Sequence, residues 1–95
     1  MRKVLLLTPM TLAACAAQQP QVHGVTPGHE CDEANTSQYV GQLGTADTGA
    51  AVIRATKAAV LRWAPPNTLL TMDYREDRVT IWVDEAKKIT KIRCG

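Results

Sequence analysis

Cysteine is the residue type that most constrains this chain of 95 residues, which contains three of them. Two, Cys31 and Cys94, lie at the two ends of the segment 31–95. A segment of that size is only marginally stable on the strength of its apolar core. A disulfide between its ends would close a loop of about 60 residues and add roughly 4 kcal/mol in the chain-entropy model. Cys15 is then left without a cysteine partner and needs a role of its own.

The first 14 residues have the pattern of an export signal. The positive pair Arg2-Lys3 precedes a short apolar stretch, residues 4–12, which Pro9 interrupts. The stretch is too short to cross a membrane, because a spanning helix needs about 20 apolar residues. A secretory signal implies an oxidising compartment, in which Cys31 and Cys94 can pair.

The end of this signal, Leu12-Ala13-Ala14-Cys15, resembles the bacterial lipobox, in which the cysteine is lipid-modified and becomes the N-terminus. The alternative is an ordinary signal cut after Ala14 or Ala17. On the lipoprotein interpretation, residues 1–14 are removed and Cys15 holds the protein on a membrane of the bacterial cell envelope. Ala16, in place of Asp, favours the outer membrane, with the domain facing the periplasm. Without lipid on Cys15 the protein is secreted.

Charge gives no indication of a nucleic-acid partner. The formal net charge is +2, from 11 Lys and Arg against 9 Asp and Glu. Removal of Arg2 and Lys3 with the signal leaves 9 against 9 (11 − 2 = 9), so the mature chain is neutral. A nucleic-acid-binding domain is typically basic, and that class is excluded.

Residues 15–30 are predicted to be the lipid anchor and a flexible tether. They are rich in Gln, Pro and Gly and have no apolar periodicity. His23, His29 and Cys31 lie near one another and suggest metal binding as an alternative. A structural zinc site usually shows four ligands at recognisable spacings, and Cys31 already has a partner, so we predict no metal and no cofactor.

The segment 31–95 is predicted to fold as one α+β domain. Apolar periodicity and turn residues indicate a short helix or turn, a main helix capped by Thr45, Asp47 or Thr48 and running to about Lys57, and strands at 59–63, 78–84 and 89–94. Within 78–84, Val79, Ile81 and Val83 alternate with Thr80 and Trp82. Ile89 and Ile92 do not alternate, so we expect a bulge there or Ile89 in the turn. The helix would pack on one small sheet.

The connection after the first strand is the candidate functional segment. Pro65-Pro66-Asn67 excludes regular structure, and Leu69, Leu70 and Met72 follow where polar residues are usual. The segment contains no Ser/His/Asp set, glycine-rich phosphate loop or metal-ligand cluster, so we predict that the protein is not an enzyme. An extended, partly apolar loop is what a protease cleft binds.

At this point a family resemblance becomes specific. Thr71-Met72-Asp73-Tyr74-Arg75, followed by Asp77-Arg78-Val79, resembles the reactive loop and following strand of the potato inhibitor I family. Cys31, Cys94 and the ending Arg93-Cys94-Gly95 look still more like the bacterial and fungal branch of disulfide-bearing elastase inhibitors. The resemblance covers about residues 31–95. It implies one helix on a small mixed β-sheet with an exposed protease-binding loop.

The resemblance also implies a function, the inhibition of serine proteases by a substrate-like loop. Met72 would enter the specificity pocket of a subtilisin-, elastase- or chymotrypsin-like protease, and Met72–Asp73 would be the scissile bond. The implied protease-binding residues are Leu70, Thr71, Met72, Asp73, Tyr74 and Arg75. Arg78 matches a family arginine that supports the loop from below, by hydrogen bonds to Thr71 and Asp73. The second such arginine is replaced by Thr80, for which Arg93 or Arg75 would compensate.

The substitution at Thr80 leaves one alternative open. The same fold could serve as a non-inhibitory module that binds another protein of the envelope. In either case we expect a monomer whose partner is a protein, either a serine protease or an envelope component, with the membrane contacted through Cys15.

Overall fold

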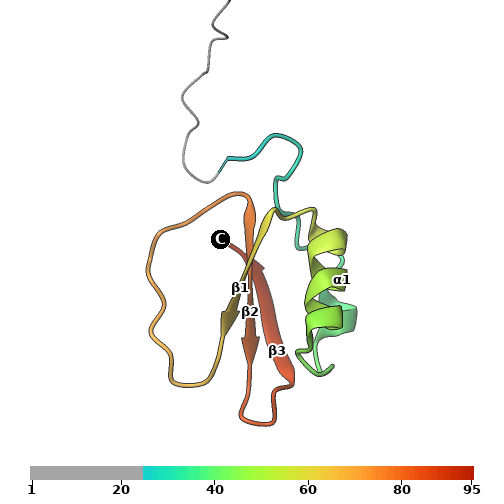
Figure 1. Cartoon of the computed structure of the whole chain (residues 1–95), viewed down its shortest axis with the longest axis vertical. Coiled ribbons are helices and arrows are strands. Elements are labelled where there is room, and N and C mark those ends of the chain that lie inside the picture. Colours follow the sequence, from blue (N-terminus) through green and yellow to red (C-terminus); the bar gives the residue numbers. More distant parts are fainter. Residues whose placement is uncertain (1–24) are drawn as a thin grey trace, which may run out of the picture.

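The computed structural model describes residues 25–95, which form one helix packed on one face of a three-stranded sheet. The elements are a short 3-10 helix η1 (Ser37–Tyr39), the helix α1 (Ala46–Thr56) and the strands β1 (Val60–Ala64), β2 (Arg78–Val83) and β3 (Ile89–Cys94). The strand order is β1-β2-β3 (Figure 1). Strands β1 and β2 are parallel, whereas β2 and β3 are antiparallel. The predicted α+β fold with a mixed sheet is therefore confirmed.

The helix α1 begins and ends at residues that suit helix termini. Of the three predicted caps, Thr45 is the one used, and its hydroxyl accepts a hydrogen bond from the Thr48 N–H at 3.1 Å. The helix ends at Lys57, which adopts a left-handed conformation with φ of 67°. Val52 and Thr56 are fully buried on the face turned to the sheet.

The core lies between α1 and the sheet and consists of small aliphatic side chains: Val52, Ala58, Val79, Ile81, Ile89 and Ile92. As predicted, Val79, Ile81 and Val83 turn to the same side. The register of β2 and β3 skips Thr90, so that Trp82 faces Lys91 and Val83 faces Ile89. This bulge explains how Ile89 and Ile92, three residues apart, both reach the core.

A disulfide joins the start of this domain to its last strand, as predicted. Cys31 and Cys94 are bonded, with their Cα atoms 5.7 Å apart. Cys15 and His23 lie outside the described residues. Within residues 25–95 there is no cluster of three His, Cys, Asp or Glu side chains that could bind a metal ion. In the same range, no helix is long and apolar enough to cross a membrane.

The parallel pairing of β1 and β2 determines the path of the connection between them. Because the two strands run in the same direction, the chain must return the full length of the sheet between Ala64 and Arg78. Such a return usually contains a helix, but here an irregular loop, residues 65–77, makes it alone. Figure 1 shows this loop on the side of the sheet away from α1. The face of the sheet opposite the core is therefore the face on which the loop rests.

Candidate functional site

The loop of residues 65–77 displays apolar side chains to solvent. Leu69 is 97% exposed, Met72 is 95% exposed and Tyr74 is 67% exposed. Leu70 is partly covered. Large apolar residues so exposed contribute nothing to the core, and a cluster of them indicates a binding surface.

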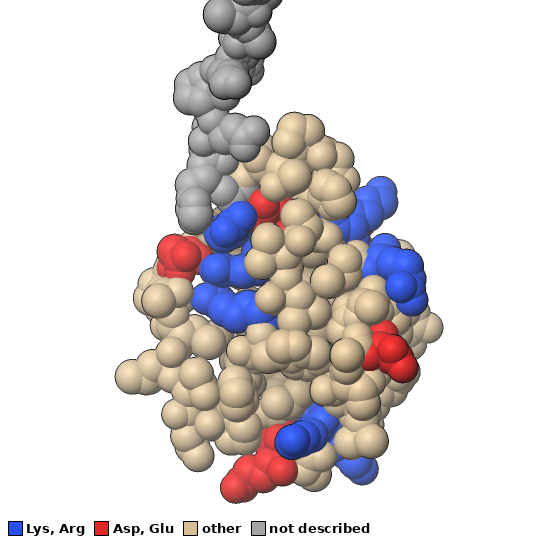
Figure 2. Space-filling view, viewed as in Figure 1, with Lys and Arg blue, Asp and Glu red and all other residues tan. Residues whose placement is uncertain are grey.

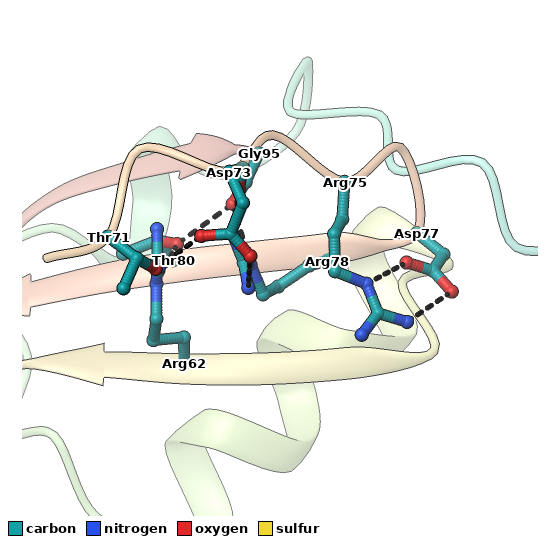
Figure 3. A network of polar contacts seen from close by, with 8 residues as sticks. All are labelled: Arg62, Thr71, Asp73, Arg75, Asp77, Arg78, Thr80 and Gly95. Carbon is teal, nitrogen blue, oxygen red and sulfur yellow. Dashed lines mark hydrogen bonds and ion pairs between the residues drawn. The ribbon is translucent and has the colours of Figure 1, made fainter. Parts of the chain in front are cut away.

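Arg78 supports the loop from the first position of β2. Its Nη2 donates to the Asp73 carbonyl oxygen at 2.5 Å, and its Nε donates to the Gly95 backbone oxygen at 3.0 Å (Figure 3). Its Nη1 also lies 3.6 Å from Asp73 Oδ2. The Arg78 side chain is only 9% exposed, so its charge is held beneath the loop. The structure thus brings Arg78 to Asp73, whereas Thr71, its other predicted partner, is bound by another arginine.

That other arginine is Arg62 of β1, which the sequence analysis missed. Arg62 Nη1 donates to Thr71 Oγ1 at 3.2 Å, and its Nε donates to Thr80 Oγ1 at 3.2 Å. Arg62 faces Thr80 directly in the parallel register. Arg62 therefore supplies, from the neighbouring strand, a guanidinium in place of the second loop-supporting arginine that Thr80 replaces. Strand alternation could have indicated the face of the sheet on which Arg62 lies, because Arg62 stands between the two inward positions Leu61 and Trp63.

The two arginines that were predicted to compensate for Thr80 lie elsewhere. Arg93 Nη1 donates to Glu33 Oε1 at 3.1 Å, and Glu33 Oε2 accepts the Cys94 N–H at 2.8 Å. The prediction that Arg93 supports the loop is therefore wrong, because a carboxylate held at the outer edge of β3 binds its guanidinium. Arg75 binds Asp77 through two parallel hydrogen bonds, from Nε at 3.0 Å and from Nη2 at 3.1 Å.

The polar contacts around Met72 form a closed ring. Thr71 Oγ1 accepts from Arg62 and donates to the Asp73 carboxylate, which lies beside Arg78. Thr80 Oγ1 donates to the Gly95 oxygen at 3.1 Å, the same atom that Arg78 binds. The residues on both sides of Met72, Thr71 and Asp73, are thus fixed to β1 and β2 (Figure 3). Met72 itself is 95% exposed to solvent.

The electrostatics of this ring favour an ionised Asp73. The Thr71 hydroxyl makes the largest contribution in lowering the pKa of Asp73, followed by the backbone N–H of Asp73 itself, with smaller effects from the charges of Arg78 and Arg62. Figure 2 shows Lys and Arg side chains gathered between the loop and the body of the domain. The ionised carboxylate of Asp73 is therefore the form that the hydrogen bonds and charges around it stabilise.

Asp77 anchors the far end of the loop. Its carboxylate is 1% exposed and accepts both hydrogen bonds from Arg75 and one from the Thr26 hydroxyl at 2.5 Å. Arg75 first, and then Thr26, lower the pKa of Asp77 to about 2. The carbonyl oxygen of Asp77 accepts from the N–H groups of Ala59 and Val60. This residue therefore connects the loop to the start of β1.

The low pKa of Asp77 predicts a loss of stability in acid. A carboxyl group has a pKa near 3.9 in an unfolded chain, so its lower value of about 2 in the folded chain stabilises the fold above pH 4. This contribution is lost as the pH falls from about 4 to about 2. In Asp77→Asn, the midpoint of urea denaturation should therefore fall less steeply with decreasing pH over that range than in the wild type. Asp47→Asn, which removes a carboxylate from α1, controls for the loss of one charge; equal slopes in the wild type and Asp77→Asn would contradict the prediction.

Comparison with known proteins identifies the family. The model of the peptidase inhibitor I78 family matches residues 31–95. The chain belongs to this family. Its members are inhibitors of peptidases, which agrees with the prediction that the protein is not an enzyme.

A solved structure supports the same assignment. The elastase inhibitor AFUEI is 29% identical in sequence to this chain and superposes with a TM-score of 0.50. The match covers 62% of this chain and 81% of the AFUEI chain. A comparison with curated proteins finds no matching relative. The likeness to an elastase inhibitor is thus confirmed, whereas the disulfide-bearing bacterial and fungal branch and the wider potato inhibitor I resemblance stay predictions.

Proposed function

We propose that this peptidase inhibitor acts on serine proteases through a substrate-like loop, with Met72–Asp73 as the scissile bond. The observation that carries the proposal is the ring of hydrogen bonds that fixes Thr71 and Asp73 while Met72 is 95% exposed. A side chain presented in this way can enter a specificity pocket without any rearrangement of the loop. Because little conformational freedom is then lost on binding, the complex gains affinity.

The same ring supports inhibition over hydrolysis. Attack of the catalytic serine on the Met72 carbonyl carbon would form an acyl-enzyme and release the amine of Asp73. Arg78 binds Asp73 through both its carbonyl oxygen and its carboxylate, so the released amine would stay beside the ester. The amine can then attack the ester and re-form the peptide bond, and it also occupies the place that water needs.

The target class follows from the side chain of Met72. An unbranched, uncharged side chain suits the apolar pockets of subtilisin-, elastase- and chymotrypsin-like enzymes, whereas a trypsin-like pocket has a carboxylate that binds cations. The alternative of a non-inhibitory binding module rested on Thr80. Arg62 supplies the missing donors at that position, so this observation no longer favours the alternative.

We also propose that the inhibitor is lipid-anchored at Cys15 in a bacterial envelope, on the outer membrane and facing the periplasm. The support is the Leu-Ala-Ala-Cys sequence at residues 12–15 behind a signal-like stretch. The mass of the mature protein tests this directly, because a lipid anchor adds a diacylglycerol to Cys15. A mature chain without that adduct would refute the anchor.

The inhibitory function is tested by titrating the full chain against subtilisin, elastase, chymotrypsin and trypsin. We expect stoichiometric inhibition of the first three, weak inhibition of trypsin, and slow hydrolysis confined to Met72–Asp73 as judged by mass spectrometry. Rapid turnover of that bond, or no inhibition of any of the four proteases, would sink the proposal.

A further inference from the structure

The residues just before the family domain form a turn, although they were predicted to be the end of a flexible tether. In Thr26-Pro27-Gly28-His29 the His29 N–H donates to the Thr26 carbonyl oxygen at 2.9 Å. Gly28, at the third position, has φ of +81°, and proline occupies the second. This is the residue pattern of a type II turn, in which proline presets the second position and glycine tolerates the third. The tether prediction is therefore wrong for these four residues.

Polar contacts hold this turn on the domain. His29 Nδ1 lies 2.9 Å from the Lys57 carbonyl oxygen at the end of α1. The Thr26 hydroxyl donates to Asp77 Oδ2 at 2.5 Å, across 51 residues of sequence. Immediately after the turn, the Cys31 N–H donates to the Glu76 carbonyl oxygen at 2.8 Å. The turn therefore bridges the helix terminus and the last residues of the loop.

Close packing does not join the turn to the loop near Tyr74 and Glu76. A hollow of about 880 Å³ lies between the turn and the loop, and its lining includes Val25, Pro27, Tyr74 and Glu76. Thr26 also lines this hollow, and its hydroxyl donates directly to the Asp77 carboxylate that binds Arg75. Arg75 is two residues beyond the bond Met72–Asp73, on the side that carries the leaving amine.

We propose that the turn Thr26–His29 is a working part of the inhibitor, in which Thr26 positions Asp77 and thereby holds Arg75 and the arm of the loop that follows the scissile bond. Thr26 is a positioning residue, because it acts through Asp77 and lies outside the segment 31–95 that defines the family domain. The inference rests on the proposed inhibitory function. A looser arm would let the new amine move away from the acyl-enzyme, so that hydrolysis competes with religation.

The test compares Thr26→Val, which keeps the shape of the side chain and removes the hydroxyl, with the wild type in the full chain. We expect inhibition of elastase and subtilisin to weaken on the order of tenfold, as for the loss of one hydrogen bond to a charged group. The rate of hydrolysis at Met72–Asp73 should rise by a similar factor. The pKa of the Asp77 carboxyl, followed by NMR, should rise because Thr26 is one of the donors that lower it.

Two further variants separate positioning from general destabilisation. Thr26→Ser restores a hydroxyl and should recover both the inhibition and the Asp77 pKa. Thr90→Val removes a hydroxyl that donates to the Trp82 carbonyl oxygen, remote from the turn, and should change neither. If valine prevents folding, Thr26→Ala compared with Thr26→Ser provides the same contrast.

The outcomes distinguish this inference from the proposed function. If the wild type inhibits and Thr26→Val inhibits equally well with the same rate of hydrolysis, the inference is overturned. If the wild type inhibits no protease, the proposed function fails. In that case the inference is decided by the rate of cleavage at Met72–Asp73 and by the pKa of Asp77. It is overturned if both quantities are the same in Thr26→Val as in the wild type.

Discussion

Met72→Lys is expected to weaken inhibition of elastase and chymotrypsin about 100-fold or more and to create inhibition of trypsin. The Met72 side chain is 95% exposed, and its neighbours Thr71 and Asp73 are the anchored residues. A change of side chain at this position should therefore alter what enters the protease and leave the loop intact. A lysine placed in an apolar pocket must lose its hydration without a partner. In a trypsin-like pocket a carboxylate would bind it.

A matched variant makes this result specific to the loop. Val40→Lys introduces the same charge at another exposed apolar residue, 47% accessible, that follows η1 on a different part of the surface. It should leave all inhibition constants within about twofold of the wild type. Unchanged inhibition of elastase by Met72→Lys would show that Met72 is not the residue that the protease reads, and another scissile bond would then have to be sought.

The support of the loop shows which side chains local sequence can identify. Arg78 was identified because it follows the loop within a few residues, inside a recognisable motif. Arg62 precedes the loop on another strand and reaches Thr71 only because β1 and β2 pair in parallel with Arg62 opposite Thr80. That pairing brings together residues 18 apart in sequence, so alternation within a strand indicates the face of Arg62 but not its partner.

The predictions that the structure corrects, for Arg93 and for the tether, were wrong for a related reason. Arg93 lies opposite Thr80 on β3, so it stands on the same face of the sheet as Thr80. Glu33 binds it instead, and Glu33 is brought to the edge of β3 by contacts across about 60 residues, next to the disulfide. Likewise, composition alone predicted an anchor and tether over residues 15–30, of which 26–29 form a turn. The Thr-Pro-Gly-His turn was readable from local sequence, whereas its contact with Asp77 depends on the tertiary fold.

The double variant Cys31→Ser/Cys94→Ser is expected to lose about 4 kcal/mol in free energy of unfolding, because the disulfide closes a loop with a sequence separation of 63 residues. The core that remains is made of small aliphatic side chains. A domain of this size has little stability in reserve. The measurement is urea denaturation of the oxidised wild type and the double variant, both in a Cys15→Ser background that prevents new disulfides.

The site should respond to this change more strongly than the rest of the fold. Cys94 precedes Gly95, whose backbone oxygen accepts hydrogen bonds from both Arg78 and Thr80. The disulfide therefore helps to hold in place the oxygen that positions the Arg78 side chain. In the fraction of the double variant that is still folded, we therefore expect faster hydrolysis at Met72–Asp73 than in the wild type. Reducing agent should reproduce both effects in the oxidised protein and add nothing to the double variant. A loss of less than about 1 kcal/mol would contradict the prediction, and it would mean that the aliphatic core alone keeps the domain folded.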